Sequence, residues 1–270
     1  MATGVFSPGR AKIKETTLRT DRWWLAPLLT FVFLVAWISY ATVRVFMQKY
    51  YWGAENVEQT FLHYLTPFYS PCISEGCIPE SSSIRFLPDA WWLPYAAMTL
   101  PFLLLFRLTC YYYRKAYYRA FWLSPPACAV AEPHAKYTGE TRFPLLGQNL
   151  HRYFFYAAVI ISAINTYDAF LAFHGKDGGF GVGLGAVILW INVIALWTYT
   201  ISCHSCRSLI GGRLTHFSKH PVRYKLWTQV SKLNTKHQEL AWVTLGTLAF
   251  TDFYVMCVSA GWINDLRFFN

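Results

Sequence analysis

The chain has 270 residues, of which 54% are hydrophobic, 19% are aromatic and 14% are charged. About a quarter of the residues in a soluble domain are charged, so a soluble fold of this composition would expose large apolar patches to water. The 21 Phe, 18 Tyr and 12 Trp residues exclude a disordered chain, because they offer far too much buriable surface. The composition therefore predicts an integral membrane protein.

Five apolar stretches are long enough to cross a bilayer, whose hydrocarbon core of about 30 Å needs roughly 20 helical residues. They cover residues 23–46, 90–113, 152–173, 178–206 and 238–263. The runs are continuous rather than alternating, which favours helices over a barrel. We predict an all-α bundle of five transmembrane helices forming a single membrane domain over residues 23–270, with no internal repeat. The remaining segments are a basic tail at 1–22, an outer loop at 47–89, and inner loops at 114–151 and 207–237.

The positive charges predict the orientation of the chain. Nineteen of the 24 lysines and arginines lie in the tail and in the two inner connections with their flanks. Because cytoplasmic loops carry an excess of these residues, the N-terminus is predicted to be cytoplasmic and the C-terminus outside. The same bias accounts for the net charge of +10, so we expect no nucleic-acid partner.

The seven cysteines divide between the two sides of the predicted membrane. Cys72 and Cys77 lie in the outer loop, within Pro-Cys-Ile-Ser-Glu-Gly-Cys, where an oxidising compartment and an intervening glycine favour a local disulfide. Cys257 lies alone in the outer half of the last span. Near the inner boundary thiols stay reduced, so metal binding or catalysis better explains the four cysteines that gather there: Cys110, Cys128, Cys203 and Cys206.

Six of the eight histidines also lie on the inner side. His151 begins the third span and His237 begins the fifth, while Cys203 and Cys206 end the fourth. Three positions apart on a helix, these two thiols would share a face and could bind one iron or zinc atom. Two thiolates on one iron and two imidazoles on the other describe a Rieske-type [2Fe–2S] cluster. We therefore predict a metal site formed by His151, His237, Cys203 and Cys206.

The sequence also allows other ligands and another cofactor at this site. His204 would point about 100° away from Cys203 on a helix, so it is a reserve ligand, as are Cys110 and Cys128. The alternative cofactor is a single b-type haem between His151 and His237, because such a haem needs two facing imidazoles. A membrane thiol oxidoreductase built on Cys203 and Cys206 is a further alternative, disfavoured by the reducing side and by the lack of a thioredoxin-like unit.

Two carboxylates, Asp168 and Asp252, lie in the outer parts of the third and fifth spans. Burying a charge there costs at least ~2.5 kcal/mol unless the charge is relieved. The two groups can pair across the spans or join a proton path, which is the basis of an alternative function as a proton or solute transporter subunit. We expect both instead to reach water near the outer headgroups.

Several strings resemble the membrane-anchor subunit of actinobacterial succinate dehydrogenases, and most closely its mycobacterial single-anchor form. The resemblance covers nearly the whole chain and rests on residues 109–119, 124–128, 139–145, 149–153, 203–207 and 233–242. It implies a flavoprotein partner that oxidises succinate and an iron–sulfur partner that delivers electrons to this anchor. It also implies a quinone acceptor, menaquinone, and a Rieske-type cluster in place of the two b haems of better-known relatives.

On this resemblance the chain is a multi-pass protein of the bacterial plasma membrane and one subunit of complex II, and it is not an enzyme alone. No dinucleotide fingerprint is present that would bind FAD. A quinone site combines an aromatic wall with hydrogen-bond donors for two carbonyl oxygens. The residues of this kind near the inner boundary are Arg119, Trp122, His134 and Tyr153.

Overall fold

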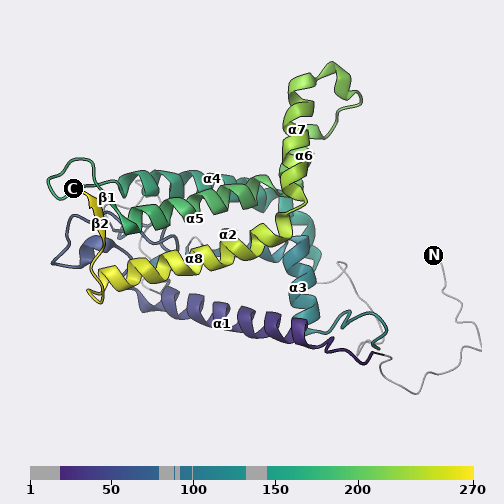
Figure 1. Ribbon diagram of the computed structural model, residues 1–270, viewed down its shortest axis with the longest axis horizontal. Helices are drawn as coiled ribbons and strands as arrows, with labels where there is room; N and C mark the ends of the chain where they lie inside the picture. The colour runs from purple at the N-terminus through teal and green to yellow at the C-terminus, as the bar shows by residue number, and fades with distance from the viewer. Residues whose placement is uncertain (1–18, 79–87, 89–91, 99, 132–144) are drawn as a thin grey trace, which may run out of the picture.

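The computed structural model describes residues 19–78, 88, 92–98, 100–131 and 145–270 of the chain. Long helices run side by side through the body of the molecule (Figure 1). Within the described residues, four helices are long and apolar enough to cross a membrane: α1 (Leu25–Met47), α4 (His151–Leu171), α5 (Leu184–Ile201) and α8 (His237–Ser259). Three of the predicted spans thus match α1, α4 and α8 to within a few residues. The predicted tail up to residue 18 and the start of the second predicted span lie outside the described residues.

The second apolar stretch forms a shorter helix than predicted. After a 3-10 turn at Tyr95–Ala97, helix α2 covers Leu100–Leu108, and the backbone is extended at Cys110 with φ −68° and ψ 132°. Helix α3 (Tyr111–Phe121) then runs in a new direction, across the end of the bundle (Figure 1). The predicted continuation of this span to residue 113 was wrong, because the sequence changes after Leu108 from apolar to aromatic and basic residues that prefer the membrane interface.

The fourth predicted span, 178–206, was too long at both ends. Its start is a turn followed by strand β1 (Val182–Gly183), which pairs antiparallel with strand β2 (Arg267–Phe269). Its end is a break after Ile201, where Cys203 adopts an extended conformation and caps helix α6 (His204–Gly211) with its thiol. Small polar residues such as Ser202 compete for backbone hydrogen bonds and therefore favour caps over helix interiors.

The second predicted inner loop, 207–237, is largely helical. Helix α6 and helix α7 (Pro221–Asn234) form a hairpin that projects from the bundle at a steep angle to the long helices (Figure 1). Short 3-10 turns at Leu145–Leu150 and Phe217–Lys219 precede α4 and α7. The two hairpin helices are joined by hydrogen bonds from Arg207 Nε to Ser231 Oγ at 3.0 Å and from Arg223 Nε to the Ile210 carbonyl at 2.8 Å.

The outer loop, which contains the 3-10 turn Gly53–Glu55, folds back onto the bundle. The carboxylate of Asp265 accepts hydrogen bonds from the hydroxyls of Tyr64 and Tyr254, each at 2.7 Å, and from the Gly185 N–H at 2.9 Å. Burial, with the Asp265 charge, raises the pKa of Tyr64 well above its usual value. This carboxylate therefore connects the outer loop, the start of α5 and the C-terminal segment.

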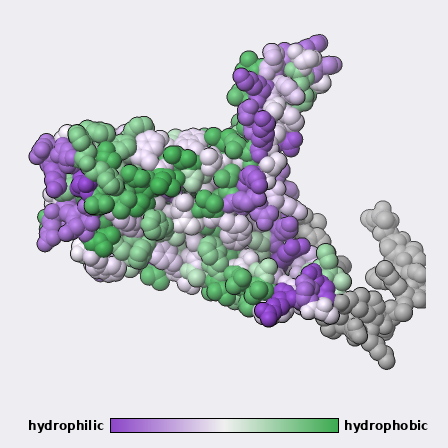
Figure 2. Space-filling view, in the orientation of Figure 1, coloured by the Kyte–Doolittle hydropathy of each residue, from purple (hydrophilic) through white to green (hydrophobic). Residues whose placement is uncertain are grey.

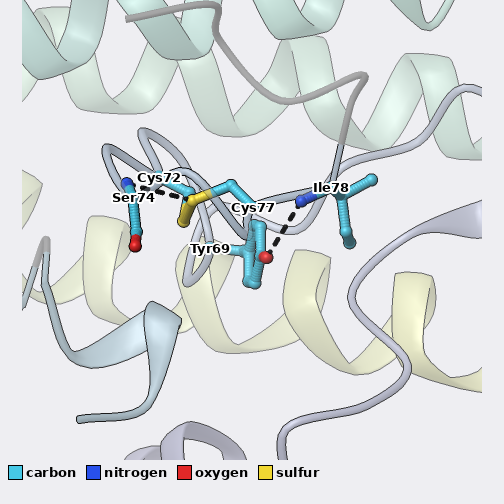
Figure 3. Close-up of a disulfide and its surroundings, with 5 residues drawn as sticks. All are labelled: Tyr69, Cys72, Ser74, Cys77 and Ile78. Atoms are coloured by element: carbon cyan, nitrogen blue, oxygen red, sulfur yellow. Dashed lines mark hydrogen bonds between the residues drawn. A yellow bond between two sulfur atoms is a disulfide. The ribbon is translucent and has the colours of Figure 1, made fainter. Parts of the chain in front are cut away.

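A disulfide joins Cys72 and Cys77 in this loop, with their Cα atoms 6.0 Å apart (Figure 3). This is the pairing predicted from the sequence. The Cys77 sulfur accepts a hydrogen bond from the Ser74 N–H at 3.2 Å, and the Ile78 N–H donates to the Tyr69 hydroxyl at 3.2 Å. The bridge and both hydrogen bonds restrain the turn where the loop covers the helices.

The surface has the distribution expected of a membrane protein. Hydrophobic residues cover the sides of the long helices, and hydrophilic residues gather at the end that bears the C-terminus and on the α6–α7 hairpin (Figure 2). Large apolar side chains on the bundle are exposed, for example Leu29 and Ile160, each at 60%. In a bilayer these side chains contact lipid rather than water.

The two intramembrane carboxylates are buried, so the expectation that they reach water was wrong. Asp252 is 0% exposed and accepts hydrogen bonds from Arg44 Nε at 2.6 Å and Arg44 Nη2 at 3.0 Å, and from the hydroxyls of Tyr40 and Thr66. Asp168 is 3% exposed and accepts from the Ser70 hydroxyl, so the two carboxylates do not pair with each other. The physical reason is the outer loop, which supplies Thr66 and Ser70 and covers both sites.

Removing one partner of the buried Arg44–Asp252 pair should destabilise the protein strongly. Arg44→Met leaves the Asp252 carboxylate buried without a cation, and we expect a loss of roughly 3–5 kcal/mol in the free energy of unfolding. Replacing both residues, as Arg44→Met with Asp252→Leu, should recover most of this loss because no charge remains buried. Thermal unfolding of the purified protein in detergent measures the effect, with exposed Lys49→Met as the control. Equal losses in the single and double variants would contradict this account.

Candidate functional site

Four elements meet at the end of the bundle where α4 and α8 begin, and each brings one histidine or cysteine to the same place. His151 is the first residue of α4 and His237 is the first residue of α8. Cys110 precedes α3 and Cys203 precedes α6, each as the N-cap residue. Cys110, Cys203 and His237 are at most 2% exposed. All four donors therefore lie where the chain turns into or out of a helix.

The hydrogen bonds of His151 fix its tautomer. Its Nδ1 lies 2.8 Å from the Thr109 hydroxyl, and that hydroxyl donates its proton to the Leu105 carbonyl at 2.7 Å. With the hydroxyl proton on the Leu105 carbonyl, Nδ1 donates toward Thr109 and Nε2 carries the lone pair. Nε2 lies 3.2 Å from the sulfur of Cys203. This imidazole therefore presents a metal-binding lone pair beside a thiol.

His237 repeats this arrangement with different partners. Its Nδ1 lies 2.7 Å from the Ser202 hydroxyl, which donates to the Tyr199 carbonyl at 2.8 Å. Nε2 thus carries the lone pair here as well, and it lies 3.6 Å from the sulfur of Cys110. A hydrogen bond on one ring nitrogen that leaves the other free is the usual arrangement of a metal-ligating histidine.

Each imidazole also stacks on an aromatic ring. Phe106 lies parallel to His151 with ring centroids 5.0 Å apart, and Tyr199 lies parallel to His237 at 4.9 Å. Both aromatic residues belong to the hydrophobic cluster that encloses the two buried cysteines. The rings therefore hold the imidazole planes and exclude water from one side of each.

These contacts follow a five-residue pattern that occurs twice: an aromatic residue, two others, a hydroxyl residue and a cysteine. The two copies are residues 106–110 and 199–203. In each copy the aromatic residue and the hydroxyl hold one histidine, while the cysteine faces the other histidine. We expected no internal repeat and missed this short one, although its spacing is visible in the sequence.

The predicted pairing of Cys203 with Cys206 depended on one continuous helix, which the chain does not form. Cys203 is extended, whereas Cys206 lies half-buried within α6. Cys110, predicted only as a reserve ligand, is the second thiol at the site. The other two reserve residues are exposed: His204, whose ring centroid lies 6.4 Å from that of His237, and Cys128.

The donor set is arranged as two His–Cys pairs rather than around one point. In the part of the chain that the structure describes, no group of three or more His, Cys, Asp and Glu side chains could hold a single metal ion. Burial raises the pKa of the Cys203 thiol to about 11, so this thiol keeps its proton at neutral pH unless a metal replaces it.

The residues predicted to bind quinone lie on different elements. Arg119 is in α3, Trp122 follows α3 with 52% of its surface exposed, and Tyr153 is 67% exposed on α4. His134 lies outside the described residues. The aromatic side chains of Tyr117 and Tyr118 contact Trp122, with ring centroids at 5.9 Å and 5.8 Å.

Fold and site together define a helical membrane protein with a buried imidazole–thiol cluster at one end of its bundle. The family model for the actinobacterial succinate dehydrogenase subunit SdhC matches residues 25–261, and the chain belongs to this family. A chain in the solved structure described as "Mycobacterium smegmatis Sdh1 complex in the apo form" is 65% identical, with full coverage of both chains and a TM-score of 0.89. No match was found among curated proteins.

These comparisons confirm the resemblance noted in the sequence. The chain is an SdhC-type membrane anchor of a succinate dehydrogenase complex and a multi-pass protein of the bacterial plasma membrane. Its partners are the other subunits of that complex, in agreement with the predicted flavoprotein and iron–sulfur subunits.

The two hydroxyls that hold the imidazoles should contribute measurably to stability. In Thr109→Val or Ser202→Ala the Nδ1–H of a buried histidine loses its acceptor, which costs about 1–3 kcal/mol. The melting temperature of the purified complex measures this, with Thr109→Ser expected to retain stability because it keeps the hydroxyl. Thr198→Val is the control, since its hydroxyl bonds only a helix carbonyl. Unchanged melting in both test variants would show that the assigned tautomers are wrong.

Proposed function

We propose that this anchor passes electrons from a partner iron–sulfur subunit to a membrane quinone, menaquinone, through a Rieske-type [2Fe–2S] cluster near the cytoplasmic face. His151, His237, Cys110 and Cys203 would hold the cluster. The observation that carries this proposal is the pair of Nε2 lone pairs, each assigned by hydrogen bonds and each beside a buried thiol. When bound, such a cluster supplies one-electron transfer at a potential raised by its two imidazole ligands.

The side chains present fit this group better than the ligand set predicted from the sequence. Two imidazoles and two thiols are the donors of a Rieske-type centre, and Cys110 supplies the second thiol in place of Cys206. Thr109 and Ser202 orient the imidazoles, and Phe106 and Tyr199 shield them from water. Hydrogen bonds to the Nδ1 atoms of the ligating imidazoles and an apolar surrounding both tune the redox potential of such a site.

A single b-type haem is less compatible with this geometry. A haem between His151 and His237 would need open space in front of each Nε2 atom. Here each Nε2 faces a sulfur at 3.2 or 3.6 Å, and each ring is stacked on an aromatic side chain. Family membership likewise favours an anchor over the alternative of a proton or solute transporter.

We also propose that α2, with the turn before it, makes a fifth crossing of the membrane, and that the end of the bundle with the His–Cys pairs faces the cytoplasm. Supporting this orientation, the α6–α7 hairpin at that end carries six lysines and arginines over residues 204–234. Such an excess is typical of the cytoplasmic side. The same charges suit docking of a soluble partner with an acidic face.

Spectroscopy of the purified complex tests the cofactor directly. We expect iron and acid-labile sulfide in excess of the clusters of the partner subunits. In the reduced complex, an electron paramagnetic resonance signal of the Rieske type should be present. A strong Soret absorption band with no such signal would instead establish the haem alternative.

The histidines should be essential for electron transfer but not for assembly. His151→Ala combined with His237→Ala is expected to abolish succinate-driven quinone reduction, because both imidazole ligands are lost. Reduction of a water-soluble dye by the partner subunits reports assembly of the complex. His204→Ala, which lies outside the paired donors, is the matched control. Normal quinone reduction in the double variant would remove both histidines from the ligand set.

The cysteines distinguish the ligand set of the structure from the one predicted by sequence. Cys110→Ser and Cys203→Ser should each remove the Rieske-type signal, because serine replaces a thiolate ligand. Cys206→Ser and Cys128→Ser should leave the signal and quinone reduction unchanged. If Cys206→Ser removed the signal and Cys110→Ser preserved it, the assignment made from the structure would be wrong.

A further inference from the structure

We propose that a pocket at the end of the bundle that bears the C-terminus binds the zwitterionic headgroup of a membrane phospholipid, phosphoethanolamine. The pocket lies where the outer loop follows the last turn of α1 (Figure 1). In this proposal Lys49 contacts the phosphate of the headgroup and Glu55 contacts its ammonium. The His–Cys pairs lie at the other end of the bundle, so the site does not depend on which cofactor they hold.

The wall of the pocket is largely aromatic. The pocket has a volume of about 340 Å³, and its aromatic lining residues are Tyr51, Trp52, Tyr69 and Tyr95. Tyr51, Trp52 and Tyr69 are each at most 6% exposed, and the rings of Tyr51 and Tyr69 lie 5.0 Å apart. The Tyr69 hydroxyl also accepts the N–H of Ile78, next to the disulfide (Figure 3). Packing therefore holds the wall in place, and the volume falls within the roughly 300–1,000 Å³ of ligand clefts.

Glu55 brings a negative charge to this pocket and is held in a fixed position. Its Oε2 accepts the N–H of Tyr50 at 2.7 Å, and its Oε1 accepts the N–H groups of Tyr51 at 2.9 Å and Trp52 at 3.1 Å. A carboxylate has about four acceptor positions, two on each oxygen, so these three bonds leave one position on Oε2. An ammonium group can donate to that position, and the aromatic wall favours a cation beside it.

Lys49 brings a positive charge to the same pocket. Its side chain is exposed, and its Nζ lies 5.0 Å from the centroid of the Tyr50 ring. Because the Glu55 carboxylate binds the N–H of Tyr50, the residue after Lys49, the two opposite charges are brought together by a short stretch of backbone. Within the described residues neither charged side chain forms an ion pair. A ligand with a single charge would face a like charge here, whereas a zwitterion is complementary to both residues.

The position of the pocket matches the level of phospholipid headgroups. Lys49 follows Met47, the last residue of the membrane-crossing helix α1, by two positions. Near this end of α1, Val43 and Phe46 are 59% and 66% exposed and offer apolar surface to acyl chains. Basic and aromatic residues are common at this level in membrane proteins, but here they enclose a cavity together with a carboxylate. This combination distinguishes a headgroup site from an ordinary interfacial belt.

Native mass spectrometry of the purified complex, freed of bound lipid and titrated with short-chain lipids, tests the site. We expect saturable binding of dihexanoyl phosphatidylethanolamine and weaker binding of dihexanoyl phosphatidylglycerol, which has the phosphate but no ammonium. Lys49→Met should raise the apparent Kd for the ethanolamine lipid about tenfold, because the phosphate loses its cation. Glu55→Gln should remove the preference for ethanolamine over glycerol. Glu58→Gln changes an exposed carboxylate of the same loop that does not line the pocket, and this matched control should bind as the wild type does.

Three results would overturn the proposal. Equal apparent Kd values for the ethanolamine and glycerol lipids in the wild type would show that the ammonium is not recognised. Wild-type affinity in both Lys49→Met and Glu55→Gln would place the bound lipid elsewhere. Free phosphoethanolamine that binds as tightly as the lipid would identify a soluble ligand as the occupant. The mass of the intact complex reports the assembly of each variant in the same spectrum, so a variant that fails to assemble is recognised and the other variant gives the result.

Discussion

Every backbone N–H and C=O group inside a bilayer must find a hydrogen bond within its own segment, so the chain can change direction only near the membrane boundary or under a protein cover. Helices α2 and α5 both end in this way, and their last residues turn into α3 and α6. The turns leave Cys110 and Cys203 in extended conformations beside the first residues of α4 and α8. The position of the site is therefore a consequence of where helices can stop.

The two turn segments support each other through the histidines. In residues 106–110, the aromatic ring and the hydroxyl contact His151, whereas the cysteine lies beside His237. In residues 199–203, the aromatic ring and the hydroxyl contact His237, whereas the cysteine lies beside His151. Each imidazole is therefore held by both segments. These shared contacts fix the separation of α2 from α5 as well as the planes of the two imidazole rings.

The sequence predicted long apolar helices well, because an uncharged run of about 20 residues has few alternatives in a membrane protein. His151, His237 and Cys203 were predicted from their common depth, which needs only the span boundaries. Cys110 was predicted only as a reserve ligand, because its position beside His237 depends on the helix break at Thr109 and Cys110. The spacing of three residues between Cys203 and Cys206 favoured Cys206 instead. The burial of Asp252 could not be read from its depth, since it depends on an outer loop folding back over the bundle and on a contact with Arg44 from a distant helix.

The order of the elements along the chain also sets the order in which this region can be built. Three of the four donors have left the ribosome before α8 is made, but His237 is the first residue of that last long helix. The fourth donor, His237, reaches the site only when α8 has been inserted, and Cys110 then lies beside it. The complete set of four donors is therefore assembled only at a late step in biogenesis.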